Sequence, residues 1–359
     1  MLFFLSASLF FVPFLTRINA YSIDPVSCKG KQYDLMLKAA EAAFDLANEA
    51  YAAIQPTPRD NNVQRLISLL FGDQADLSRV RDSLRRLQFA RTKLEPEGRG
   101  MISSNQVMFY CDLERVRRSE RLGQSRWIDS VTNRMFNDNQ GETVETCKSS
   151  LDTTLAVTWN PDEKVVPQEG RFVSTATPSQ VTLCPWFINW AVNEDYQVWN
   201  DMSLKVVAAT AAIPLLTRNP FNYPLTPVDA FGLLERVILH ELTHTTLGGK
   251  SEDVEMQQGG LWPLKIAYGW RATRNLVEQG VQGEDLPSKN ADSIALFAMG
   301  IKLLGQETPT YIEDNGSLSK TVPGSSKRKV QSTLRYRSTP AAFEGFVKMI
   351  RETRADPDF

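Results

Sequence analysis

The sequence predicts an α+β fold, with a mainly helical N-terminal region, a small sheet, and further helices after it. Three observations support this prediction. Apolar residues recur at helical spacing within residues 21–100, short β-branched runs lie between residues 107 and 184, and helical spacing returns from about residue 196. The chain has 359 residues, of which 42% are hydrophobic and 23% charged, as is usual for a globular protein.

The chain begins with an apolar segment, residues 2–15, and carries no charged side chain before Arg17. This segment is short for a bilayer span, and Ala20 is a small residue suited to signal-peptidase cleavage. We therefore predict a signal peptide over residues 1–20 and a secreted, extracellular protein with no membrane segment after cleavage. An uncleaved membrane anchor is the alternative interpretation of the same segment.

Four cysteines agree with export, because an even number of cysteines in an exported chain favours disulfides. Three pairings exist. We favour Cys28–Cys111 and Cys147–Cys184, which keep each bridge within its own stretch of chain. The sequon at Asn315 lies in a polar segment, where a glycan could be attached.

Residues 21–100 are expected to form a helical region, either a removable pro-segment or an integral part of the fold. Residues 33–54 have a helical apolar repeat that ends before Pro56, and residues 63–94 contain one or two more helices with arginines facing outward. Strands are predicted at residues 107–110, 155–159, 172–175 and 181–184. Later helices are predicted at residues 196–213, 228–246, 270–279 and 291–304.

Residues 306–359 are polar and basic, and we expect a flexible arm that ends in a short amphipathic helix at residues 341–353. The arm contains Lys327-Arg328-Lys329, for which dibasic processing is a second interpretation. The formal net charge of the whole chain is −2, which argues against nucleic acid as a partner.

The segment His240-Glu241-Leu242-Thr243-His244 carries the chemistry of the chain. Residues four apart lie on one face of a helix, so both imidazoles can bind one ion. Glu241 lies beside them and can reach a metal-bound water. The chain has only two histidines, and both are at this spacing. The segment predicts one catalytic Zn²⁺, held by His240 and His244, with Glu241 as general base.

A catalytic zinc site needs a third protein ligand, and the two histidines are already used. Because the cysteines are expected in disulfides, the third ligand must be acidic. Asp253 is favoured, since it follows a Gly-Gly turn that could return the chain to the metal, and Glu255 is an alternative. Glu278 would give a thermolysin-like arrangement, and Asp292, on a later helix, is the remaining candidate.

Together with Tyr268-Gly269-Trp270 and residues 290–298 (NADSIALFA), the HExxH segment resembles the deuterolysin or aspzincin family of fungal zinc metalloendopeptidases. Residues 181–185 resemble the strand that precedes the active-site helix in that family, and the similarity spans roughly residues 154–304. The resemblance implies a zincin-like catalytic domain, here residues 101–305. It also implies an aspartate as third ligand and a tyrosine, Tyr268, that stabilises the oxyanion.

The family's Gly-Thr-x-Asp-x-x-Tyr-Gly pattern is interrupted here, because an insertion that includes residues 259–263 separates Asp253 from Tyr268. Both residues can still reach the metal if the insertion bulges outward. Asp292 matches an aspartate near the site in the family, and we expect it either behind a metal ligand or in the substrate pocket. Ala295 stands where lysine-specific relatives have an acidic residue, so strict lysine specificity is not expected.

The expected function is that of a secreted, monomeric zinc endopeptidase. Its substrate is a protein or peptide, held in extended form along the strand at residues 181–184. The alternative is a catalytically inactive secreted zinc-binding or surface-interaction protein of the same fold, which the interrupted third-ligand pattern motivates. Retention of Glu241 argues against it, because a purely structural metal site needs no base.

Overall fold

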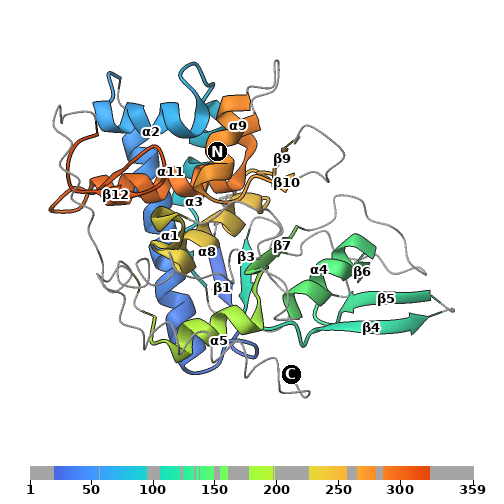
Figure 1. Cartoon of the computed structure of the whole chain (residues 1–359). Coiled ribbons are helices and arrows are strands. Elements are labelled where there is room, and N and C mark those ends of the chain that lie inside the picture. Colours follow the sequence, from blue (N-terminus) through green and yellow to red (C-terminus); the bar gives the residue numbers. More distant parts are fainter. Residues whose placement is uncertain are drawn as a thin grey trace, which may run out of the picture.

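The computed structural model describes residues 20–323 except 56, 95–105, 122–123, 133–134, 137, 149–153, 161–177, 197, 199–225, 257–264 and 280–285. The architecture is α+β, as expected. A five-stranded sheet packs against a group of helices, and a smaller three-stranded sheet extends to one side (Figure 1).

The main sheet combines strands from distant parts of the chain. Its order is β2 (Thr92–Lys93), β1 (Ala20–Ile23), β3 (Val107–Tyr110), β8 (Ser179–Leu183) and β7 (Ala156–Trp159). The first four strands run parallel, and β7 is antiparallel to β8. The expectation that β8 offers a free edge to substrate is wrong, because β8 pairs on both sides. In the described part of the chain, β7 ends the sheet.

The N-terminal helices share one core with the later ones. Helix α1 (Lys31–Ile54) packs against α3 (Ser78–Gln88), α8 (Leu233–His244) and α11 (Ala291–Leu304), and α2 (Asn61–Phe71) packs against α11. A row of fully buried alanines on α1 lets the neighbouring helices approach closely: Ala39, Ala43, Ala47 and Ala50. The region also contributes β1 and β2 to the sheet, so it shares both a sheet and a core with later parts of the chain.

Both expected disulfides are present. Cys28–Cys111 joins the segment after β1 to the end of β3, and Cys147–Cys184 joins α4 (Asp138–Lys148) to the start of α5 (Pro185–Asn193). Helix α4 lies against the three-stranded antiparallel sheet, which consists of β4 (Val116–Arg121), β5 (Gln124–Asp129) and β6 (Met135–Phe136). None of the described helices is long and apolar enough to cross a membrane.

The helix expected at residues 228–246 is two helices. Thr226 and Asp229 form a capping box at the start of α7 (Pro227–Ala230). The chain then turns at Gly232, which has φ 55° and ψ 41°, a left-handed conformation that favours glycine. Helix α8 begins directly after this turn. The expected helices at residues 270–279 and 291–304 agree with α9 (Trp270–Gln279) and α11.

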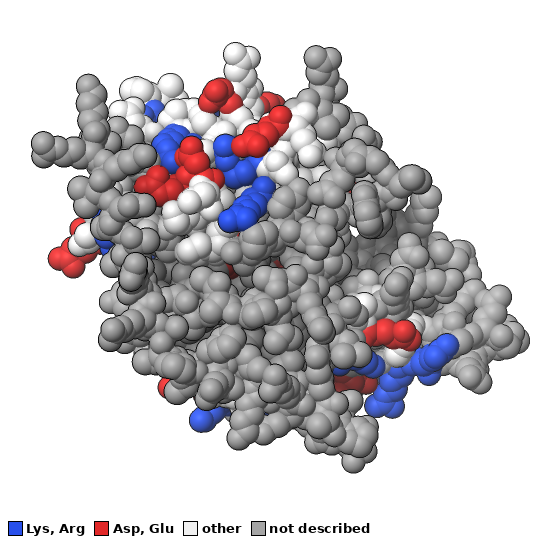
Figure 2. Space-filling model, in the orientation of Figure 1, with Lys and Arg blue, Asp and Glu red and all other residues white. Residues whose placement is uncertain are grey.

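The arm expected from residue 306 is wrong for residues 306–323. They pack on the body of the protein through a hairpin of β11 (Tyr311–Ile312) and β12 (Leu318–Ser319). Arg65 donates to the Ile312 carbonyl, and Trp270 Nε1 donates to the Asp314 carbonyl. On the face shown in Figure 2, described basic and acidic side chains lie close to one another. The predicted elements at residues 172–175 and 341–353, the dibasic segment, residues 1–19 and nearly all of residues 196–213 lie outside the described residues.

Candidate metal centre

Helix α8 brings the two histidines together on its buried side. Leu234, Ile238 and Leu242 are fully buried and hold the helix against the core. The imidazoles of His240 and His244 project from successive turns, with ring centroids 4.8 Å apart. Their Nε2 atoms lie 3.0 Å apart. The spacing of the HExxH segment therefore produces the expected pair of converging ligands.

Asp253 supplies the third atom of the group. Its Oδ1 lies 3.2 Å from Nε2 of His240 and 3.1 Å from Nε2 of His244. Ligand atoms about 2.0–2.1 Å from a tetrahedral zinc ion stand about 3.3 Å from one another, so this triangle has nearly the size that zinc requires. Oδ1 is buried and has no hydrogen bond, although both rings are near. A buried oxygen aimed at two ring nitrogens fits a shared cation.

The loop after α8 returns Asp253 to the helix. Gly248 is required there, because a Cβ would lie 2.0 Å from the Leu242 carbonyl oxygen. Ser251 N donates to the Thr243 carbonyl, and Glu252 then forms a parallel bridge with Asn290. The Asn290 side chain accepts from Val254 N and donates to the Ala267 carbonyl. Asp253 is thus held between α8 and the start of α11.

The chain segments on either side of the insertion after Asp253 lie side by side. Strands β9 (Glu255–Met256) and β10 (Lys265–Ile266) pair in antiparallel fashion, so the chain leaves and returns at the same place. The residues between them, 257–264, lie outside the described residues. The hairpin places Tyr268 beside the site, with its ring centroid 5.5 Å from that of His240. Burial first, and then the charge of Asp253, raise the pKa of Tyr268 well above its usual value. Its hydroxyl therefore stays a hydrogen-bond donor.

The two ring Nδ1 atoms have different partners. Nδ1 of His244 is 2.7 Å from the Ser251 carbonyl, which can only accept, so that nitrogen carries hydrogen. Nδ1 of His240 is 3.4 Å from Oδ1 of Asp292. Such contacts fix the ring orientation and leave Nε2 for a metal ion.

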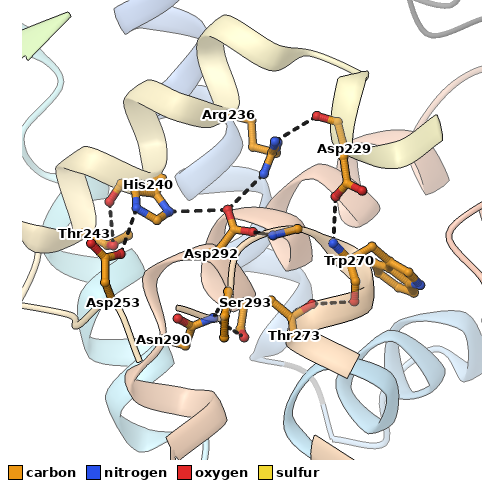
Figure 3. Close-up of polar contacts among 12 residues, drawn as sticks. Asp229, Arg236, His240, Thr243, Asp253, Trp270, Thr273, Asn290, Asp292 and Ser293 are labelled. Atoms are coloured by element: carbon orange, nitrogen blue, oxygen red, sulfur yellow. Dashed lines mark hydrogen bonds and ion pairs between the residues drawn. The ribbon is translucent and has the colours of Figure 1, made fainter. Parts of the chain in front are cut away.

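Asp292 lies behind His240, within a buried ion-pair network (Figure 3). Its Oδ1 is 2.9 Å from Nη1 of Arg236, and its Oδ2 accepts from Gly269 N at 2.6 Å. Arg236 also donates to the Asp229 carbonyl. Burial works to raise the pKa of Asp292, but Arg236 and then His240 lower it overall. Of the two roles expected for Asp292, this position favours the one behind a metal ligand.

The carboxylates of Asp253 and Asp292 stabilise positive charge at the centre. Burial works to lower the pKa of His240, yet Asp253 and Asp292 together raise it to about 10. The pKa of His244 is raised as well, against its burial, mainly by Asp253. The pKa of Asp253 is well below its usual value, because the two histidines outweigh burial. Protons on the rings or a divalent cation can supply this charge, and a cation binds in exchange for the protons.

The other candidate ligands lie away from the triangle. Glu255 is exposed on β9. Glu278 has a side chain that is 60% exposed and pairs with Arg274 at 3.1 Å, which excludes the thermolysin-like arrangement. Among the described residues, the group able to hold a metal ion is His240, His244 and Asp253.

Three residues near the centre were not anticipated: Thr158, Asn160 and Arg236. Arg236 could have been suspected, because it is a charged residue one helical turn before His240 and therefore lies on the same face of the helix. Thr158 and Asn160 carry no such local signal, since Thr158 lies on β7 and Asn160 directly follows it, both far from α8 in the sequence. Comparison of the chain with protein-family models, curated proteins and solved structures finds no match. Function must therefore be argued from the site.

Proposed function

We propose that this protein is a secreted zinc-dependent endopeptidase of the deuterolysin or aspzincin type, with a zincin-like catalytic domain. The observation that carries the proposal is the triangle of His240, His244 and Asp253, with Glu241 next to one of its members on the same helix. Two imidazoles and one carboxylate at tetrahedral spacing suit zinc, and catalytic zinc sites keep three protein ligands so that one position stays open.

When bound by these three residues, zinc would supply Lewis acidity that activates water and polarises the scissile carbonyl. Glu241 accepts the proton of the attacking water and then passes it to the leaving nitrogen. The protonated hydroxyl of Tyr268 donates a hydrogen bond to the oxyanion. Asp292 and the Ser251 carbonyl keep the two imidazoles in place throughout.

Strand β7 is the strand that would hold the substrate. It is the antiparallel edge of the main sheet in the described part of the chain, and it packs against α8. An extended peptide can add to such an edge by backbone hydrogen bonds, which would place its scissile bond beside the metal centre. This role replaces the one expected for β8. Two disulfides are compatible with the export that the N-terminal segment predicts.

The test combines metal analysis with proteolysis. The purified protein should contain about one zinc per chain and digest casein or gelatin, with activity lost on chelation and restored by zinc. The Glu241→Gln variant should keep its zinc and lose cleavage by a factor of about 10² to 10⁴. Glu278→Gln is the matched control, because that carboxylate is exposed and paired with Arg274, and its activity should be unchanged.

Two results would refute the proposal: cleavage by Glu241→Gln at the wild-type rate, or a purified protein that neither contains nor takes up zinc. Zinc binding without any cleavage by the wild type would instead indicate the inactive zinc-binding protein of the same fold.

A further inference from the structure

Along β7, the side chains that face α8 change from apolar to polar. Alternate residues of a strand point to opposite faces of the sheet. Ala156 packs into the main core, on the side of α8, whereas Val157 and Trp159 pack into a second cluster on the other face. The same alternation places Thr158 and Asn160 on the side of α8, where apolar residues would be expected next to a buried helix.

Both polar residues bind the active-site helix. Thr158 Oγ1 donates to Oε2 of Glu241 at 2.6 Å and lies 3.2 Å from the Glu241 carbonyl oxygen. Asn160 Nδ2 donates to the His244 carbonyl at 2.8 Å, and its Oδ1 accepts from Thr246 N at 2.8 Å. Two successive helix-facing side chains therefore join β7 to the last turn of α8.

The shorter contact of Thr158 is with the side-chain carboxylate of Glu241, which is the proposed base. Glu241 is only 7% exposed, so its side-chain oxygens have limited access to water. A hydrogen bond to a charged group is stronger and shorter than a neutral one, and it restricts the carboxylate to one orientation. Since Oε2 accepts from Thr158, the other oxygen, Oε1, is left to take up a proton.

On the basis of the proposed function, we propose that Thr158 is a positioning residue for the general base. It holds Oε2 of Glu241, so that Oε1 takes the proton from the attacking water and returns it to the leaving nitrogen. Thr158 keeps its own proton throughout. Asn160 fixes the end of α8 against the same strand. The strand that would bind the substrate backbone thus also sets the position of the base.

The decisive variant is Thr158→Val, which keeps the shape of the side chain and removes the hydroxyl. We expect kcat to fall about 10- to 100-fold, the equivalent of losing a hydrogen bond to a charged group, with KM changed less than about twofold. Thr158→Ser keeps the hydroxyl and should restore kcat to within about threefold of wild type. Thr158→Ala provides the same test if the valine variant does not fold.

Two measurements separate positioning from a merely structural role. Zinc affinity, measured by competition with a chelator, should be unchanged in Thr158→Val, because Thr158 does not bind a metal ligand side chain. Thr273→Val is the matched control, since Thr273 has a buried hydroxyl that bonds a helix carbonyl on α9. It should lose comparable stability and no activity.

The inference is overturned if Thr158→Val keeps wild-type kcat, if Thr158→Ser fails to restore it, or if zinc affinity falls in parallel with kcat. These failures are distinct from failure of the proposed function. If the proposed function fails, the wild type does not cleave, or Glu241→Gln cleaves normally, and both results are obtained without any change at Thr158.

Discussion

Replacement of Asp292 by asparagine tests how far the metal centre depends on the ion pair behind it. The side chains of Arg236 and Asp292 are only 9% and 5% exposed, and their charged atoms are 2.9 Å apart. Removal of one partner of a buried pair leaves the other charge uncompensated, at a cost of about 3–5 kcal/mol. Asparagine retains the shape of the side chain, so the loss of stability can be attributed to removal of the negative charge.

The same substitution weakens the support of His240. Nδ1 of His240 loses an anionic neighbour, and loss of such a partner lowers metal affinity about 10- to 100-fold. Urea unfolding of the metal-stripped protein measures the first effect, and competition with a chelator measures the second. Asp82→Asn is a suitable control, because it weakens exposed ion pairs with Arg85 and Arg86, each worth no more than about 1 kcal/mol.

A double variant shows whether the two charges are coupled. Adding Arg236→Met to Asp292→Asn removes the uncompensated guanidinium, so the double variant should lose less stability than the sum of the single variants. The reasoning is refuted if Asp292→Asn unfolds with a free energy within about 0.5 kcal/mol of wild type and binds zinc with unchanged affinity.

Two further predictions concern pH and the loop after α8. The folded-state pKa of His240 is raised from 6.5 to about 10, so its contribution to the stability of the metal-stripped protein is fully present below pH 6.5 and is lost as the pH rises through about 10. The urea midpoint of the wild type should therefore fall over this pH range more steeply than that of His240→Gln. An equal dependence of the midpoint on pH in both proteins would show that the raised pKa of His240 is not the cause. Gly248→Ala should prevent stable folding or zinc binding, because its Cβ would meet backbone atoms of Leu242 and Thr243 at 2.0 and 2.7 Å. Gly249→Ala, which has open space but φ 91°, should cost only about 1 kcal/mol, and similar losses in both variants would exclude the steric explanation.

Residue spacing along one helix was sufficient to predict that His240 and His244 converge as candidate metal ligands. His240 and His244 converge because helical geometry is fixed by neighbouring residues of the chain. Both cysteine pairs were likewise anticipated from their order along the chain. The helix break at Gly232 was not, since glycine within a helical pattern is tolerated at many positions.

The roles of the acidic residues depended on the tertiary structure. Spacing and the Gly-Gly turn favoured Asp253 but left Glu255 open, and only the path of the loop between α8 and Asn290 places Asp253 beside the two histidines. Asp292 is placed behind His240 by the packing of α11 on α8 and by the charge of Arg236. Neither packing nor charge partners can be read from residues so far apart in the chain.

The sequence by itself determined that two imidazoles and a neighbouring carboxylate lie on one helix, because these positions follow from the backbone geometry of five consecutive residues. Only the tertiary structure decided that β7 ends the main sheet among the described strands and that Thr158 contacts Glu241, since 83 residues separate Thr158 from Glu241. Strand order and register arise from the burial of side chains across the whole core, and a short sequence pattern does not contain that information.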